Sequence, residues 1–323
     1  MAIVAVAGGT GNIGRTIVDA ILATGKHQVK VLSRKANPKL EAEIGAPLVP
    51  VDYSDVDALA KVLEDNNVDT VVSGIAMHSE DGSKPQEVEL IRAADRSRTT
   101  KRLISSEWGV PFKDEHIGQI PSVAHKREAA RALEATTTLE HTVFHVGFFI
   151  DYWGLGPHGV PGVPSYLATR TPFVTWLDMA HGAAAIPGSG DVPVVFTHTA
   201  DVARFVAASL DLPRWERETF VQGDRLTWNQ FLRLAEEARG IKFTVAYDGK
   251  EKLKLGQTTE LPGQVPLYSF FPKPVMHSMI AAFGQWFEDG LFDLRPVRFL
   301  NESFPEIKPL TVKEMLDKSW KSS

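Results

Sequence analysis

The chain begins with a short apolar run that gives way to a cluster of glycines. Residues 3–7 read IVAVA, and GGTGNIG follows at 8–14. The glycines satisfy two overlapping spacings, GxxGxxG from Gly8 and GxGxxG from Gly9. Backbone without Cβ atoms lets a pyrophosphate approach closely, and the N–H groups that open the next helix can bind it. The pattern predicts a strand, a tight turn and a helix that bind a dinucleotide. A glycine turn that serves only helix packing is the alternative.

Further apolar runs alternate with helical spacing along the first half of the chain. Strands are expected at 29–32, 47–51, 69–76, 101–106 and 142–149, and helices at 15–24, 56–63, 87–97 and 123–135. This alternation predicts an α/β fold with a doubly wound parallel sheet of the Rossmann type. Ligands bind such sheets at the carboxyl ends of the strands, so we expect the cofactor to contact the glycine turn and the strand ends. The turn and strand residues expected to contact it are Gly8, Thr10, Gly11, Asn12, Ile13, Gly14, Ser33, Arg34, Lys35, Asp52, Tyr53, Gly74, Ile75, Ala76, Ser106, Glu107, Val146 and Phe148. Lys126, on the helix expected at 123–135, is also expected among the cofactor contacts, on the family resemblance given below.

The residues after the second expected strand favour a phosphorylated cofactor. A fold that prefers NAD usually has an acidic residue there for the ribose 2'-hydroxyl, whereas this chain has Ser33, Arg34 and Lys35. A guanidinium can hold a 2'-phosphate through two hydrogen bonds, while a carboxylate would repel it. The pattern therefore indicates NADPH/NADP as the cofactor. A solvated basic turn is the alternative.

One lysine stands on the apolar face of the helix expected at 123–135. At 100° per residue, Lys126 falls within the stripe formed by Val123, Ala130 and Leu133. Its ammonium either extends to the rim of the fold or serves a site. Position 122 is Ser, so the Tyr-x-x-x-Lys dyad of the common short-chain dehydrogenases is absent.

Four stretches together carry a family resemblance over about residues 1–210. They are GGTGNIG at 8–14, SEWG at 106–109, KREAARALEA from Lys126 and FHVGFF at 144–149. The chain resembles the NmrA-like and isoflavone reductase-like atypical short-chain reductases. In the reductases of that family an SEFG motif follows the fifth strand, and a lysine that opens the next helix is the catalytic residue near the nicotinamide.

The resemblance implies roles for particular residues of this chain. Lys126 matches the catalytic lysine, and Arg131 and Glu134 match the arginine and glutamate that follow it in the family. Arg34 matches the residue that holds the 2'-phosphate in the members that use NADPH. The chain departs from the pattern at Trp108, where the family has phenylalanine, and at Ala130, where it has an arginine. The aromatic change puts the pocket contacts implied by the family in question.

Aromatic residues after the sixth expected strand suggest a hydrophobic substrate. Phe148 and Phe149 follow a glycine where the family lines its pocket, and Trp153 precedes a Gly/Pro-rich loop at 154–164. Such a loop suits a mobile cover. The expected substrate pocket contains Trp108, Phe148, Phe149, Trp153 and Phe271. Packing of these aromatic residues in a second core is the alternative.

Two domains are expected from the change in pattern along the chain. Residues 1–153 form the dinucleotide-binding domain, to which 193–212 return, and residues 154–192 and 213–323 form a smaller α+β substrate-binding region. Within the second half, a strand is expected at 193–196, a helix from Thr199 and another at 228–239.

Composition excludes several kinds of site. The 323 residues include no cysteine and carry a formal net charge of −5, so disulfides and thiolate sites are excluded and nothing indicates a nucleic-acid surface. The ten histidines lack metal-ligand spacing. No run approaches the length of a membrane span, and the first apolar run is too short for a signal peptide. A cytoplasmic location is expected.

The sequence thus predicts an NADPH-dependent reductase of a hydrophobic aromatic or polycyclic natural product. A hydride would pass to a C=C, C=N or C=O group, and Lys126 would polarise the acceptor or deliver the proton. A cofactor-sensing NmrA-like regulator without turnover is one alternative. A cyclase or isomerase that retains the cofactor is another.

Overall fold

The computed structural model describes residues 1–77, 84–170 and 173–321. The chain divides into two compact units. The first contains Met1–His145, Val202–Phe220 and Leu300–Ile307, and the second contains Val146–Asp201, Val221–Phe299 and Lys308–Ser323. These boundaries differ from the expected ones, because residues 146–153 and the strand expected at 193–196 belong to the second unit.

A seven-stranded parallel sheet forms the centre of the first unit, with the strand order β11-β6-β5-β4-β1-β2-β3. Its strands are β1 Ile3–Ala7, β2 Gln28–Ser33, β3 Leu48–Pro50, β4 Thr70–Ser73, β5 Arg102–Gly109, β6 Glu140–His145 and β11 Glu218–Phe220. Every neighbouring pair is parallel. The doubly wound fold is therefore confirmed. The structure adds β11, which pairs with β6 although it comes late in the chain.

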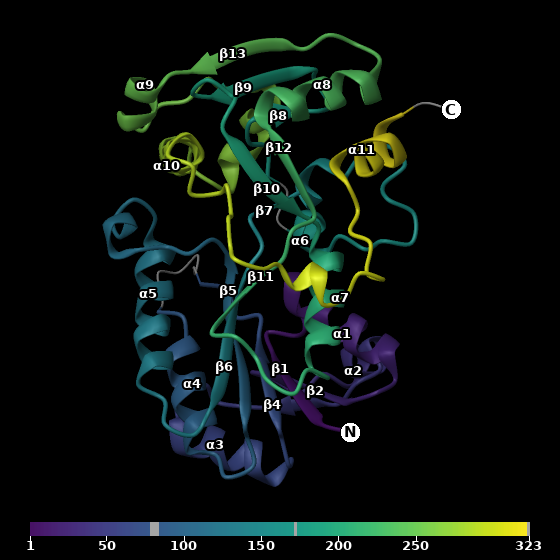
Figure 1. Ribbon diagram of the computed structural model, residues 1–323, viewed down its shortest axis with the longest axis vertical. Coiled ribbons are helices and arrows are strands. Elements are labelled where there is room, and N and C mark those ends of the chain that lie inside the picture. The colour runs from purple at the N-terminus through teal and green to yellow at the C-terminus, as the bar shows by residue number, and fades with distance from the viewer. Residues whose placement is uncertain (78–83, 171–172, 322–323) are drawn as a thin grey trace. The chain divides into compact units, whose positions relative to one another are not determined.

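Helices cover both faces of this sheet. Its helices are α1 Asn12–Thr24, α2 Pro38–Ile44, α3 Val56–Asp65, α4 Glu87–Arg96, α5 Pro121–Glu134 and α7 Thr199–Ser209, with the short 3-10 turns η1 Asp114–His116 and η4 Leu300–Glu302. In Figure 1, α3, α4 and α5 lie on one side of the sheet, and α1, α2 and α7 on the other. Local signals set the helix ends: Asn37 and Asp55 cap α2 and α3, and Gly25 ends α1 at a φ of +64°.

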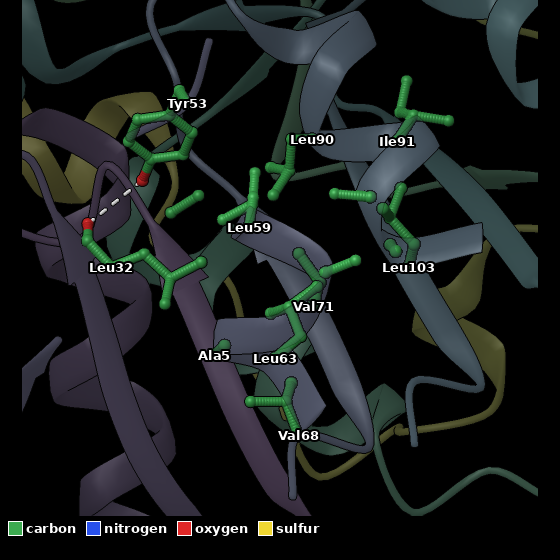
Figure 2. Packing of buried hydrophobic residues seen from close by; sticks show 14 of the residues in the cluster. Ala5, Leu32, Tyr53, Leu59, Leu63, Val68, Val71, Leu90, Ile91 and Leu103 are labelled. Atoms are coloured by element: carbon green, nitrogen blue, oxygen red, sulfur yellow. Dashed lines mark hydrogen bonds between the residues drawn. The ribbon is translucent and has the colours of Figure 1, made fainter. Parts of the chain in front are cut away.

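The hydrophobic core between the sheet and the α3/α4 side packs aliphatic side chains from both layers (Figure 2). Leu63 on α3, Val71 on β4 and Leu90 on α4 are fully buried. Tyr53 lies at the edge of this cluster, and its hydroxyl donates a hydrogen bond to the Leu32 carbonyl oxygen at 3.1 Å. Close packing against α3 and α4 thus fixes the strands whose ends carry the candidate site.

The prediction of one strand over 142–149 is wrong, because the chain turns at Gly147. β6 ends at His145, and β7 Phe148–Phe149 pairs instead with β10 in a separate sheet. Gly147 has a φ of +74°, and a Cβ atom there would lie 2.0 Å from the Val195 carbonyl oxygen. Glycine therefore permits both the turn and the close approach of β10.

The second unit contains two small three-stranded sheets, ordered β12-β10-β7 and β13-β9-β8. The remaining strands are β8 Leu177–Asp178, β9 Ala183–Pro187, β10 Pro193–Thr197, β12 Asp224–Thr227 and β13 Thr244–Asp248. Its helices are α6 Tyr166–Arg170, α8 Trp228–Arg239, α9 Lys250–Lys254, α10 Lys273–Glu288 and α11 Val312–Trp320, with the 3-10 turns η2 Asp151–Trp153 and η3 Pro262–Ser269. Over the described ranges, no helix has the length and apolar character needed to cross a bilayer.

Candidate functional site

The glycine turn between β1 and α1 is packed backbone against backbone. Gly8 has a φ of +68°, and a Cβ atom on it would lie 2.7 Å from the Gly74 carbonyl oxygen. A Cβ atom on Gly14 would lie 2.3 Å from the Gly8 carbonyl oxygen. Gly11 caps α1, Asn12 begins it at a φ of +39°, and the first turn contains no acidic residue. The turn thus presents an uncrowded helix N-terminus, of the kind that binds anions, beside the end of β4.

The basic residues after β2 are exposed to solvent. Arg34 and Lys35 are both exposed, and the Ser33 hydroxyl donates a hydrogen bond to the Lys35 carbonyl oxygen at 2.9 Å. No carboxylate stands within this short turn. The three residues therefore offer a hydroxyl and two cations at the edge where the β1–α1 turn also lies.

The two residues expected at the end of β3 differ in environment. Asp52 is exposed, and hydrogen bonds from the Ser54 hydroxyl and amide lower the pKa of its carboxyl group. Tyr53 is buried, and burial raises the pKa of its phenol well above the usual value. Asp52 thus stabilises a local turn, while Tyr53 supports the core next to the glycine turn.

The SEWG segment at the end of β5 is bulged and strained. The pairing register of β5 with β6 shifts between Ser105 and Gly109. Trp108 has a φ of +41°, a left-handed conformation that costs a bulky residue about 1–3 kcal/mol. The Trp108 indole N–H donates to the Ser73 carbonyl oxygen at 2.9 Å, and the side chain is 8% exposed. Strain of this kind is concentrated at functional sites.

Lys126 reaches from α5 to this bulge. Its Nζ donates to the Glu107 carbonyl oxygen and lies 3.2 Å from Glu107 Oε1, and both side chains are 13% exposed. A Cβ atom on Gly109 would lie 3.2 Å from Nζ, so glycine leaves room for the ammonium. The Phe112 ring centroid is 5.1 Å from Nζ. The lysine on the apolar stripe therefore meets a carboxylate, a carbonyl group and an aromatic face at the carboxyl edge of the sheet.

Glu87 belongs to the same end of the sheet and was not predicted from the sequence. It is 1% exposed, and its carboxyl group accepts hydrogen bonds from Ser73 on β4 and from Ser105 and Ser106 on β5. Burial raises the pKa of this carboxyl group, while these hydrogen bonds oppose the shift. An acid in the first turn of a helix is common because it favours the helix dipole, so the sequence carried no signal of the network.

The other predicted site residues divide between the two units. In the first unit, Ile75 and Ala76 follow β4, and the Ser106 hydroxyl donates to the Ile75 carbonyl oxygen at 2.7 Å. Thr10 lies in the glycine turn and Ile13 in the first turn of α1. Val146 and Phe148 belong to the second unit.

The aromatic residues of the second unit form a packed cluster. Phe148 is partly buried, with ring centroids of Trp176, Phe283 and Phe287 within 5.3, 5.7 and 5.8 Å. Trp153 is 2% exposed, and its indole N–H donates to the Leu177 carbonyl oxygen at 3.2 Å. The structure thus places Trp153 in an aromatic core, the alternative to a pocket wall.

The two other predicted pocket residues of the second unit are more accessible. Phe149 and Phe271 are both partly buried. The Phe271 ring centroid lies 6.2 Å from that of Phe173. These side chains retain surface that a ligand can contact.

Metal chemistry has no ligand set in the part of the chain that the structure describes. No group of three or more His, Cys, Asp or Glu side chains gathers there as metal ligands would. The candidate site in the first unit consists of a glycine turn, a basic turn and the Lys126–Glu107 pair.

Comparison with known proteins finds relatives that are named oxidoreductases and reductases. A family model described as NAD(P)H-binding matches residues 8–159. The chain is 37% identical over 309 residues to oxidoreductase BOA1 of Botryotinia fuckeliana, and the matched region covers 95% of each chain. It is 31% identical over 232 residues to pinoresinol reductase 2 of Arabidopsis thaliana, covering 67% of each. The NADPH binary complex of leucoanthocyanidin reductase from Vitis vinifera has the same fold, with a TM-score of 0.72 at 19% identity and 98% of each chain covered.

Proposed function

Because the chain belongs to the isoflavone reductase-like family of NAD(P)H-binding oxidoreductases, we propose that it is an NADPH-dependent reductase of a hydrophobic aromatic or polycyclic small molecule. The observation that most supports this proposal is the Lys126 ammonium, held by Glu107 on the bulged end of β5. A lysine with 13% of its side chain exposed and an orienting partner at the ligand-binding edge is suited to proton transfer.

The β1–α1 turn and the basic turn after β2 are the residues that would hold the cofactor. The α1 N-terminus, which has no acidic residue in its first turn, would bind the pyrophosphate through backbone N–H groups. Ser33, Arg34 and Lys35 would bind a ribose 2'-phosphate, since a guanidinium and an ammonium pair with its charge. This is the basis for NADPH over NADH.

Lys126 is the proposed proton donor. NADPH, when bound, supplies a hydride to a C=C, C=N or C=O group of the substrate. The atom that gains negative charge then needs a proton, and the Lys126 ammonium donates it or polarises that atom beforehand. The carbonyl and carboxylate oxygens of Glu107 hold the ammonium in place.

The relatives and the aromatic residues of the second unit support the proposed substrate class. Pinoresinol reductase 2 is named for the small molecule pinoresinol. The second unit contains a dense aromatic cluster, and its Phe149 and Phe271 side chains are partly exposed. Ligand sites for such molecules are mostly apolar and aromatic. A role in secondary metabolism is part of the same proposal.

Cofactor preference provides the first test. Titration of the protein should show NADPH binding at least about tenfold tighter than NADH, which corresponds to about 1.4 kcal/mol. Arg34→Ala should remove most of this preference. Arg96→Ala is the matched control. Arg96 is an exposed arginine of the same unit, at the carboxyl end of α4, and it pairs with Asp57 of α3. Equal affinities of the unmodified protein for NADPH and NADH would contradict the assignment.

Turnover provides the second test. NADPH oxidation should be followed with a panel of aromatic enones, imines and ketones. At least one member should be reduced, with the product identified by mass. Tight NADPH binding with no consumption across the panel would instead favour a cofactor sensor, and a changed substrate with no net NADPH oxidation would favour an isomerase or cyclase.

A further inference from the structure

The buried carboxyl group of Glu87 joins the ends of two central strands. It projects from the first turn of α4, and its Oε2 accepts a hydrogen bond from the Ser73 hydroxyl of β4 at 2.5 Å. Its Oε1 accepts from the Ser105 hydroxyl at 2.7 Å and from the Ser106 amide at 3.0 Å, both on β5. The three serines and Glu87 are each at most 3% exposed. The carboxyl group is thus the common acceptor of three buried donors.

The donors on β5 lie immediately before the strained part of the bulge. Ser106 precedes Glu107, whose carbonyl and carboxylate oxygens contact Lys126 Nζ. Trp108 comes next, with its left-handed backbone and its indole hydrogen bond to the Ser73 carbonyl oxygen. Glu87 and Trp108 therefore both bind Ser73 of β4. Along β5, the donors to Glu87 come just before Glu107, and Trp108 comes just after it. A strained turn persists only where surrounding contacts hold it.

This network has a cost that packing alone does not require. A buried carboxyl group is unfavourable in either protonation state unless its hydrogen bonds are satisfied. Burial also raises the pKa of Glu87, and the nearby Glu107 adds to the shift. An apolar residue would fill the space more cheaply, but it would leave Ser73, Ser105 and the Ser106 amide without their acceptor.

We infer that Glu87 is a positioning residue for the Lys126 site, because it holds the β5 bulge in the conformation that sets Glu107 against the lysine ammonium. The inference rests on the proposed function insofar as Lys126 is the proton donor. Glu87 itself acts through Ser105, Ser106 and Glu107, and the chemistry that it affects is proton delivery.

Three variants separate positioning from general stability. Glu87→Leu removes the acceptor at similar volume, Glu87→Gln restores a carbonyl oxygen for the β5 donors, and Glu89→Leu is the control on the same turn of α4. If Glu87→Leu does not fold, Glu87→Asp replaces it, because the shorter side chain withdraws the carboxyl group from β4 and β5. All are made in the full chain.

The first readout is amide hydrogen exchange of the protein without added cofactor. Peptides that cover Ser106–Gly109 should exchange at least about tenfold faster in Glu87→Leu than in the unmodified protein, while peptides from β1 and α3 keep their protection. Glu87→Gln and Glu89→Leu should exchange as the unmodified protein does. Unchanged exchange of the bulge, or an equal loss of protection across the whole first unit, would overturn the inference.

The second readout is steady-state kinetics with a substrate found in the panel. In Glu87→Leu, kcat should fall at least about tenfold, while the Kd for NADPH stays within about threefold; Glu87→Gln should recover most of kcat. A native kcat in Glu87→Leu would overturn the inference while leaving the reductase proposal intact. If the unmodified protein reduces no compound, the proposed function fails, and hydrogen exchange still decides whether Glu87 holds the bulge.

Discussion

Replacing Lys126 with methionine should change stability and turnover for different reasons. Lys126 Nζ lies 3.2 Å from Glu107 Oε1, and each side chain is 13% exposed. Loss of the ammonium leaves the Glu107 carboxylate largely buried without its cation. We expect the free energy of unfolding to fall by about 1–3 kcal/mol, as when a buried polar group loses its partner, and by less than the roughly 3–5 kcal/mol of a fully buried pair. Removal of an unpaired buried charge would raise the free energy of unfolding. Because Lys126 is paired with Glu107, its removal should lower the free energy of unfolding instead.

Turnover should fall much further than this loss explains. Removal of a general acid lowers kcat by about two to four orders of magnitude, whereas the folded fraction at 25 °C changes little in a protein of ordinary stability. The double variant Lys126→Met/Glu107→Gln replaces the unpaired Glu107 carboxylate by a neutral amide. It should recover most of the stability and none of the turnover.

The assays are chemical denaturation and NADPH oxidation with a substrate from the panel. Arg127→Met is the control, since the neighbouring arginine of α5 pairs with the exposed Asp114 at 2.8 Å. It should keep native turnover and lose at most about 1 kcal/mol, as surface ion pairs do. Native turnover in Lys126→Met would refute the catalytic role. Recovery of turnover in the double variant would show that the ammonium only neutralises Glu107.

Two further predictions concern each unit separately. Burial, with help from Arg217, lowers the pKa of His141 to about 4 from the usual 6.5. As the pH falls from 6.5 towards 4, the unfolded chain therefore binds a proton at His141 before the folded protein does. The free energy of unfolding should decrease over this range by up to about 1.4 kcal/mol per pH unit. His141→Gln should flatten that slope in denaturation at several pH values, and an unaltered slope would count against it. In the second unit, deletion of residues 159–162 should leave thermal stability nearly unchanged. Gly156→Ala should lower it, because a Cβ atom there would lie 2.1 Å from the Ser319 carbonyl oxygen; the opposite pattern would disprove this division of the loop.

Helices and central strands of the first unit could be predicted because their signals are local. Helix α8 has the predicted bounds, since a capping threonine precedes it and Gly240 follows it. The break after β6 could not be predicted in the same way. It depends on Gly147 taking a positive φ against Val195, a residue distant in sequence. The pairing of β11 with β6 is likewise a long-range event that no periodicity in the residues 218–220 reveals.

The candidate site was predictable to the extent that its residues violate a local pattern. Lys126 attracts notice because a lysine stands on an apolar stripe, and the glycines because their spacing is unusual. Glu87 violates nothing, since an acid suits the start of a helix. Its role arises only when α4 brings it beneath two strand ends.

Trp108 stands where the reductases that the sequence resembles have phenylalanine, and the structure of the β5 bulge shows what the tryptophan adds. A phenylalanine at position 108 would pack against Phe144, as Trp108 does at a centroid distance of 5.7 Å, but it has no donor for the Ser73 carbonyl oxygen. The indole N–H therefore adds a second tie between β5 and β4, beside the one that Glu87 makes. With a tie on each side of Glu107, the backbone at that residue has little freedom to shift. The position of the Lys126 ammonium then depends on the strand ends of the first unit rather than on the flexible lysine chain alone.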